Sequence, residues 1–484
     1  MSAPELQGLS LLRYLWRQLT SMRTALILLL LLGLASIPGS LFPQRTQSPL
    51  KVREYFDSDP TGAKWMDRFY LFDVYGSPWF SAIYILLFIS LIGCVVPRSW
   101  HYFREIFKAP APAPSSLRAM EGFHEVEGQL DAAQRWLKSH RFRIVRDGRS
   151  IAAEKGYLRE TGNLVFHLSL IVVLLGIAGS SVFGMRGEAI INVGERFINT
   201  PTSYDNLTPG RFFSIGNLPP FTIKADNFDA TYNPETNAPE DYVLNVTTQD
   251  GVDGDPIKKV VRVNEPLTFG STRVYLQANG YSPLVTVKDK SGEVKFEGPV
   301  PFLPQDSNLT SIGAIKVPDM EPQVGFVGSF LPTAARDKVR GGFSSFPELL
   351  DPRLLVSVWM GDLKMDSGVP QSVYRIDTED MERIGLWALR IGETYQFEVG
   401  SITFNGVIPW VNLQVVRDPG KQYALFGSIL AIIGLMASLF IRQRRIWVRE
   451  VNGKLEIAGL ALNKLPGLED EIKALTNEIK RRIA

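Results

Sequence analysis

Cysteine and histidine are nearly missing from this sequence of 484 residues. The single cysteine, Cys94, lies in an apolar run, so the chain can form no internal disulfide and has neither a CxxC redox pair nor a CxxCH haem-attachment motif. The four histidines are His101, His124, His140 and His167. These absences exclude a thiol oxidoreductase and a c-type cytochrome.

A charge excess and the common catalytic motifs are absent as well. The net charge is +2, from 52 Lys and Arg against 50 Asp and Glu, so nothing in the charge points to nucleic acid. No HExxH, GxGxxG, GxxxxGK(S/T) or GxSxG pattern occurs. The segment DGVDGDP holds Asp250, Asp253 and Asp255, but the bidentate glutamate of a calcium loop is missing, which favours a turn between strands.

What the sequence does contain is four apolar runs, each long enough to cross a hydrocarbon core of about 30 Å as a helix. They predict transmembrane helices over residues 24–42, 79–96, 163–183 and 423–441. The basic residues before the first run are typical of a secretory signal. Because three further runs follow and Pro38 interrupts the small-residue exit, we expect this helix to be retained, with Pro38 kinking its outer end. Pro97 and Arg98 are expected to end the second helix.

The connections between these runs differ in charge. Residues 97–162 carry twelve Lys or Arg, and RQRRIWVR opens the segment 442–484. The positive-inside rule places both in the cytoplasm, together with residues 1–23, and places residues 43–78 and 184–422 outside it. The aromatic-rich loop 43–78 is predicted either to lie on the membrane surface or to form a small packed lid.

Residues 184–422 alternate apolar and polar side chains in short runs separated by turn residues. The runs lie at 221–228, 241–248, 258–264, 271–278, 283–289, 293–298, 354–362 and 393–407. Their spacing predicts one β-sandwich or barrel-like domain outside the cytoplasm. Because this region has no histidine and no cysteine, iron or zinc would lack its usual ligands there. The predicted fold class is thus an α+β membrane protein with four transmembrane helices.

The two cytoplasmic segments together predict a small α/β unit. After the stiff, extended linker APAPAPSS come a strand near FHEVEG, a helix from Asp131 to His140 with Asp131 as its N-cap, and the strands RFRIVRDG and SIAAEKG. Asn452-Gly453 predicts a hairpin that joins this unit.

The end of the chain predicts an amphipathic helix. Its apolar face consists of Leu468, Ile472, Leu475, Ile479 and Ile483. Docking on the small unit, on a partner or on the membrane surface would each bury this face.

His167 is the one Asp, Glu, Lys, Arg or His side chain inside a predicted span. Because a histidine is costly to place in a membrane, it is a candidate functional residue, with a hydrogen bond to a neighbouring helix as the alternative. His101 is expected to anchor at the interface, and His124 and His140 are expected on the solvated surface.

Small residues recur at helical spacing on one face of the fourth span. They are Gly427, Ala431, Gly434 and Ser438. Such a seam predicts close packing against another helix, either of a partner or of this chain.

Four segments, taken in order, resemble the ResB (CcsB-type) proteins of the System II cytochrome c biogenesis pathway, particularly those of actinobacteria. They are RTALILLLLLGLASIPGSLFPQR, GYLRETGNLVFHLSLIVVLLGIAGS, VNEPLTFGSTRVYLQANGY and GVIPWVNLQVVRDPGKQYALFGSILAIIGLMASLFIRQRRIWVR. The resemblance covers the membrane parts and both ends of the outer domain. It rests on the order of the segments and the four-span layout more than on any single motif.

The resemblance implies a subunit of a cytochrome c synthetase in the plasma membrane. Such a subunit works with a ResC/CcsA-type membrane partner, which carries a tryptophan-rich haem-handling motif that this sequence lacks. The pair would pass haem b across the membrane and position it for attachment to the CxxCH of an exported apocytochrome c. A thioredoxin-like thiol reductant is a further implied partner.

Within that scheme His167 is the candidate axial haem ligand, opposite a histidine of the partner, and His101 could assist. No catalytic residue is visible in this chain alone. The alternative is a membrane-anchored scaffold that recruits apocytochrome or a partner without contacting haem.

Overall fold

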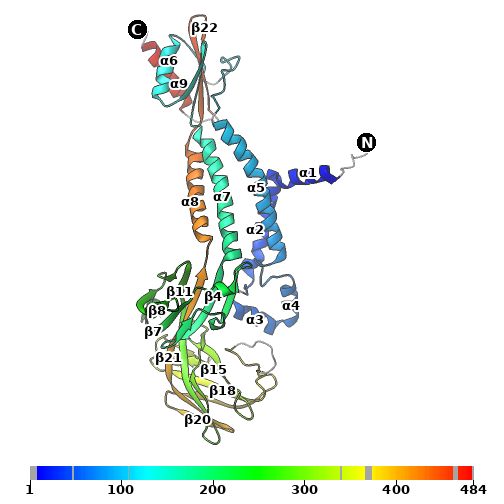
Figure 1. Cartoon of the computed structure of the whole chain (residues 1–484), viewed down its shortest axis with the longest axis vertical. Coiled ribbons are helices and arrows are strands. Elements are labelled where there is room, and N and C mark those ends of the chain that lie inside the picture. The colour runs from blue at the N-terminus through cyan, green and yellow to red at the C-terminus, as the bar shows by residue number, and fades with distance from the viewer. Residues whose placement is uncertain are drawn as a thin grey trace. The chain divides into compact units, whose positions relative to one another are not determined.

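A computed structural model describes residues 8–45, 48–106, 108–120, 122–337, 341–365, 373–461 and 467–481 (Figure 1). The chain divides into two compact units. One comprises residues 1–177 and 421–484 and holds most of the helices. The other comprises residues 178–420 and is built of strands.

The helices of the described residues are of two kinds, short ones and long apolar ones. They are α1 Gly8–Leu19, α2 Met22–Leu41, α3 Pro49–Ser58, α4 Pro60–Arg68, α5 Pro78–Ile106, α6 Leu130–Ser139, α7 Leu158–Phe183, α8 Lys421–Phe440 and α9 Leu468–Arg481. Within the described part of the chain, α2, α5, α7 and α8 are long and apolar enough to cross a membrane. The predicted fold class, four membrane helices with a large strand-rich domain, is confirmed.

Prolines lie inside two of these helices. Pro38 is in the last turn of α2, four residues before its C-cap Phe42. The expectation that Pro97 ends the second helix is wrong, because α5 continues through it to Ile106. A proline removes a single backbone hydrogen bond.

The aromatic loop between α2 and α5 forms a small packed element, the second of the two predicted alternatives. Helices α3 and α4 enclose Val52, Ala63 and Phe72, which are buried. The buried side chain of Gln44 accepts a hydrogen bond from the backbone N–H of Val74 (3.0 Å) and donates one to the carbonyl of Leu71 (3.1 Å). The loop is therefore held by its own core and by one amide.

The small α/β unit is a five-stranded antiparallel sheet with the order β1-β23-β22-β3-β2. Its strands are β1 His124–Glu127, β2 Arg143–Asp147, β3 Ser150–Lys155, β22 Arg444–Val451 and β23 Lys454–Ala461. Asn452 and Gly453 form the turn of the β22–β23 hairpin, both with positive φ, as the Asn-Gly pair predicts. The hairpin enters the middle of the sheet and completes it.

Two details of this unit differ from expectation. Helix α6 begins one residue early, so its N-cap is Gln129, and Asp131 lies in the first turn, where its carboxylate pairs with Arg146 at 2.5 Å. The Pro-Ala segment 109–116, expected as a stiff, extended linker, also packs along the sheet. Its extended backbone leaves carbonyls unused, and the indole of Trp447 donates to that of Ala111 (2.9 Å) while Arg449 donates to that of Ser115 (3.2 Å).

A buried carboxylate joins this sheet to the ends of two membrane helices. The side chain of Glu154 is 5% exposed and bonds Gln443 (2.8 Å), just beyond α8, as well as Arg445 and Arg143. Arg143 in turn donates to the carbonyl of Ile106, the last residue of α5. Burial acts to raise the pKa of Glu154, but these three partners outweigh it and hold the pKa below its usual range.

Helix α9 docks on the small sheet, which decides among its three predicted partners. Leu468, Ile472, Leu475 and Ile479 are buried against α6 and the sheet, whereas Ile483 lies outside the described residues. The apolar face predicted from the spacing is thus the face that packs.

We expect Leu475→Ala to destabilise the small unit by about 2–5 kcal/mol, because it removes a fully buried side chain from a packed core. Limited proteolysis of the purified protein during heating would measure the loss as earlier cleavage near α9. Asn477→Ala, on the exposed face of the same helix, is the matched control. Equal cleavage of both variants would contradict the docking of α9.

The second unit contains a seven-stranded, a five-stranded, a four-stranded and a two-stranded sheet. Its strands are β4 Met185–Asn192, β5 Arg196–Ile198, β6 Asn206–Pro209, β7 Phe221–Tyr232, β8 Pro239–Asp250, β9 Ile257–Arg262, β10 Leu267–Phe269, β11 Thr272–Asp289, β12 Val294–Pro299, β13 Leu303–Pro304, β14 Ser311–Val317, β15 Val324–Leu331, β16 Ala334–Asp337, β17 Gly341–Ser344, β18 Arg353–Met360, β19 Glu382–Leu389, β20 Thr394–Phe397 and β21 Gly400–Arg417. The aspartate-rich segment 250–256 connects β8 to β9.

A long ribbon of two strands runs through this unit. The runs 271–278 and 283–289, predicted as separate strands, form the continuous strand β11, which pairs with β21 from Thr272–Arg417 to Asp289–Gly400. One half of the ribbon contributes to a core with β4, β7 and β8, and the other half contributes to a core with β14, β15 and β18. The single predicted β domain therefore has two hydrophobic cores that share one ribbon.

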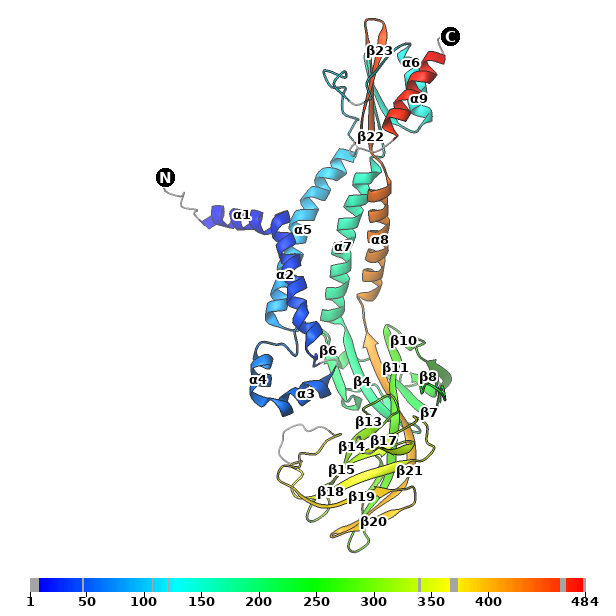
Figure 2. The ribbon, with the colours of Figure 1, turned by 180° about the vertical axis from the view of Figure 1, so that it is seen from behind.

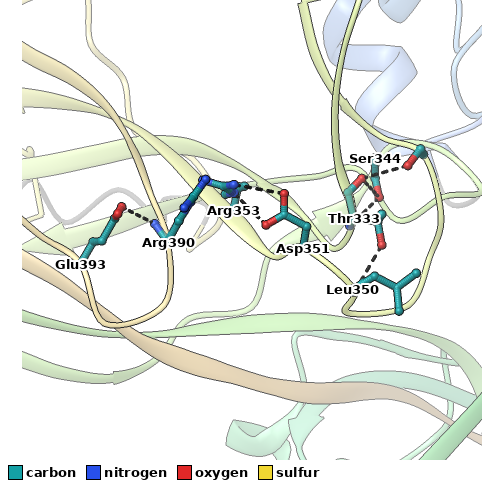
Figure 3. A network of polar contacts seen from close by, with 8 residues as sticks. Thr333, Ser344, Leu350, Asp351, Arg353, Arg390 and Glu393 are labelled. Atoms are coloured by element: carbon teal, nitrogen blue, oxygen red, sulfur yellow. Dashed lines mark hydrogen bonds and ion pairs between the residues drawn. The ribbon is translucent and has the colours of Figure 1, made fainter.

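A polar network fastens the loops at the start of β18 (Figure 3). The guanidinium of Arg353 donates twice to the carboxylate of Asp351, at 3.0 and 3.1 Å. The backbone N–H of Thr333 donates to the hydroxyl of Ser344 (3.1 Å), and the hydroxyl of Thr333 donates to the carbonyl of Glu348 (2.6 Å). These bonds hold the loops around the start of β18 in place.

Candidate functional site

Helix α7 carries His167 and begins just after a tight turn at Gly156. Gly156 has φ +81°, and a Cβ there would lie 2.0 Å from the carbonyl oxygen of Arg442, so this corner requires glycine. His167 is nine residues beyond Leu158, about 14 Å along the helix. It therefore lies within the apolar part of the span, toward the end that joins the small sheet.

The ring of His167 is half-buried and is oriented by its own helix. Its Nδ1 lies 2.8 Å from the carbonyl oxygen of Asn163, one turn earlier. A carbonyl can only accept, so Nδ1 carries the hydrogen in this bond, and in the neutral tautomer that makes it the lone pair is on Nε2. The ring of Phe166 packs edge-on at a centroid distance of 5.1 Å. A backbone carbonyl on one ring nitrogen is the usual arrangement that prepares the other nitrogen to bind a metal.

The alternative interpretation of His167 is that its ring forms a hydrogen bond to a neighbouring helix. The bond between Nδ1 and Asn163 stays within α7, so through Nδ1 the histidine does not join two helices. The interhelical hydrogen bond predicted as the alternative is not made by this nitrogen.

The small-residue seam of α8 packs against α7 of the same chain, and the two helices run side by side in both views (Figures 1 and 2). A Cβ on Gly434 would lie 2.6 Å from the backbone nitrogen of Phe166 and 2.8 Å from the carbonyl oxygen of Gly162. A Cβ on Gly427 would lie 3.0 Å from the carbonyl oxygen of Ser169. Of the two predicted partners for the seam, the structure shows a span of this chain.

His167 points away from that contact. The α7 residues that face α8 are Gly162, Phe166, Ser169 and Val173, and His167 lies about 130° around the helix from their line. Leu174, seven residues later, shares the face of His167, and the hydroxyl of Tyr84 in α5 lies 3.5 Å from its carbonyl oxygen. The imidazole is thus on the side of α7 toward α5 and is not enclosed between α7 and α8.

The other histidines occupy different places. His101 is exposed near the end of α5, next to the ring of Tyr102 at 6.2 Å, in keeping with an interfacial position. His140 is exposed and stacks on Trp136 at 3.8 Å, whereas His124 is half-buried, with Nδ1 3.0 Å from the carbonyl oxygen of Gly122. Nowhere in the described ranges do three or more His, Cys, Asp or Glu side chains form a cluster that could hold a metal ion.

A cavity of about 670 Å³ lies in the second unit and was not predicted from the sequence. Asp205 lines the cavity. Its carboxylate accepts one hydrogen bond from the backbone N–H of Ile190 (2.7 Å) and another from the hydroxyl of Tyr374 (3.1 Å). Burial raises the pKa of Tyr374 and lowers that of Lys316, which also lines the cavity. These residues come from well-separated parts of the chain, so no local motif could have indicated the cavity.

Comparison with known proteins gives consistent results along the whole chain. The model of the ResB-like family matches residues 22–473. A cytochrome c biogenesis protein CcsB of Synechococcus elongatus is 25% identical over 474 residues, which cover 96% of this chain and 92% of that protein. The cytochrome c biogenesis protein Ccs1 of Pyropia yezoensis is 21% identical over 479 residues, covering 95% and 94%. A CcsB of Synechococcus sp. (strain RCC307) is 26% identical over 471 residues, covering 94% of each chain.

The family match includes the four candidate membrane helices, the strand-rich unit, the strands of the small sheet and the first six residues of α9. The relatives align over nearly their whole lengths as well as that of this chain. This chain therefore belongs to the ResB-like family.

Proposed function

We propose that this chain is the haem-handling subunit of a System II cytochrome c synthetase. The names of the relatives support the broader role, cytochrome c biogenesis. The observation that carries the finer proposal is the orientation of His167, with Nδ1 bonded to Asn163 and Nε2 left with its lone pair inside a membrane span.

The residues of this chain offer a haem group one iron ligand, the imidazole of His167. Because the described residues assemble no cluster of ligands, His167 would hold the haem iron from this chain, and a ResC/CcsA-type partner would supply the other protein ligand. Haem b, when bound, supplies the vinyl groups that form thioethers with the cysteines of CxxCH. The part of this chain is to hold His167 in one tautomer and one direction.

Helix packing supplies that direction. The contact between α7 and α8 is made through backbone atoms at Gly162, Phe166 and Gly434, which leaves little freedom for α7 to rotate. The strand-rich unit would bring the apocytochrome peptide into reach, because positioning alone provides much of the rate gain in a reaction between two bound groups. A thioredoxin-like reductant would keep the cysteines of that peptide reduced.

The absorbance spectrum of the purified chain, alone and together with its partner, tests this function. A Soret band that depends on His167 is the expected result. If the complex assembles normally and its haem content does not depend on this chain, the scaffold function applies instead, in which the protein recruits apocytochrome or a partner without contacting haem.

The proposal includes an orientation in the plasma membrane, with the small sheet in the cytoplasm and the strand-rich unit outside it. We assign them to opposite sides because the single candidate span α7 separates them along the chain, and the Lys and Arg clusters support a cytoplasmic small sheet. A reporter that is active only outside the cytoplasm should be silent after Ala484 and active when inserted at Gly251, in the connection between β8 and β9, where a Cβ would have nothing within 4 Å. Activity at Ala484 with silence at Gly251 would reverse the assignment.

A further inference from the structure

Helix α1 has a long apolar face that the rest of the described chain leaves largely exposed. Leu9, Leu12, Leu15 and Trp16 are 77%, 64%, 52% and 54% exposed. At about 100° per residue these side chains, with Leu11 and Leu19, share one side of the helix, and Arg13, Arg17 and Ser10 lie on the other. A helix with one such face and a basic opposite face is the type that binds in a membrane interface.

The attachment of α1 fixes it at a membrane boundary. Only Thr20 and Ser21 separate it from α2, and the hydroxyl of Ser21 caps α2 by accepting from the backbone N–H of Thr24 (3.2 Å). In both views α1 runs across the direction of α2 rather than continuing it (Figures 1 and 2). The apolar face therefore begins where the first membrane span begins.

Contacts with α5 fix the position of the junction between α1 and α2. The hydroxyl of Ser90 donates to the carbonyl of Leu19 at 2.6 Å, and a Cβ on Gly93 would lie 2.1 Å from Cγ2 of Thr20. One turn beyond Gly93, α5 changes from apolar residues to Arg98, Trp100 and His101. That change marks the interface between hydrocarbon and water, and Arg98 lies 3.4 Å from the sulfur of Met22 at the start of α2.

We propose that α1 lies flat in the membrane interface on the side of the small sheet, with its leucines and Trp16 among the acyl chains and Arg13 and Arg17 against anionic lipid headgroups. We assign the lipid bilayer as the partner that covers the apolar face of α1, because α1 is joined directly to the span α2. The basic residues of α1 also match the negative charge of such headgroups. In this position α1 anchors its junction with α2, and the part of α5 that contacts this junction, at the membrane surface.

Fluorescence of the reconstituted full-length protein tests this placement. In a Cys94→Ala background, an environment-sensitive dye is attached at Leu12→Cys on the apolar face or at Ser10→Cys on the polar face. In vesicles of phosphatidylcholine and phosphatidylglycerol, we expect a blue-shifted emission and several-fold slower quenching by iodide at position 12, and neither at position 10. The Arg13→Gln, Arg17→Gln double variant should lose part of this protection in the anionic vesicles and little in pure phosphatidylcholine.

Three outcomes would overturn the proposal. Equal quenching at positions 10 and 12 would show that the apolar face is not in the lipid. Protection at position 12 that appears only when a partner protein is present would assign the face to that partner. If position 12 is protected equally in both kinds of vesicle and in the double variant, Arg13 and Arg17 do not bind the headgroups.

Discussion

Replacing His167 by alanine should remove haem from the complex and stop cytochrome c maturation, while the amount of protein stays near normal. The ring bonds only the carbonyl of its own helix in the described structure, so its loss costs α7 little packing. The loss of the Nε2 lone pair, by contrast, leaves the iron without its ligand from this chain. Haem per complex, measured by absorbance after co-purification, and the yield of holocytochrome c are the two readouts.

The His167→Asn variant separates a ligand from a residue that only stabilises the helices. Asparagine can still form a hydrogen bond in the membrane, worth about 1–2 kcal/mol, but it offers no imidazole nitrogen. We expect it to behave like alanine in haem content, and added imidazole to restore part of the haem in the alanine variant by occupying the cavity. Normal haem content and normal cytochrome c output in the asparagine variant would end the ligand hypothesis.

Replacing Gly434 by leucine should lower the level of this chain in the membrane, whether or not a partner is present. A Cβ at this position meets backbone atoms of α7 at 2.6 and 2.8 Å, and backbone cannot move aside as a side chain can. The two helices must separate along their contact, which we expect to cost about 3 kcal/mol or more. Quantitative blotting of membranes and the melting temperature of the purified protein measure the effect.

A second membrane glycine provides the control for that experiment. Gly33 lies in α2, and a Cβ built there has nothing within 4 Å. Gly33→Leu adds the same bulk to a span and should leave the level unchanged. If Gly434→Leu were as stable as Gly33→Leu but failed to recover the partner, the seam would belong to an interface between subunits.

The membrane layout and the hairpins were within reach of the sequence because they depend on local patterns. Long apolar runs identified the spans, and the positive φ favoured by Asn452 and Gly453 identified the turn of the C-terminal hairpin. The heptad-like spacing of Leu468 and Leu475 identified the face of α9 that packs. In each case the residues that decide the structure are neighbours in the chain.

The remaining features depend on residues that are distant in the sequence. Nothing local shows that runs 271–278 and 283–289 are one strand, because its continuity comes from pairing with β21. The Pro-Ala segment looks like a linker until the indole of Trp447 is placed beside Ala111. For the candidate site, the identity of His167 could be predicted from its position in a span, but the rotamer that bonds Asn163 could not.

The order of the strands has a consequence for biosynthesis. The central hairpin β22–β23 of the small sheet is made last, and Arg445 in it lies 291 positions after its partner Glu154. The strand β21 likewise follows every other strand of its own unit. Until the ribosome has passed these segments, β1, β3, β4 and β11 have unpaired edges, and such edges expose a nascent chain to aggregation and proteolysis. Both sheets therefore close late in synthesis, so a chain that terminates before β21 leaves unpaired strand edges in each of them.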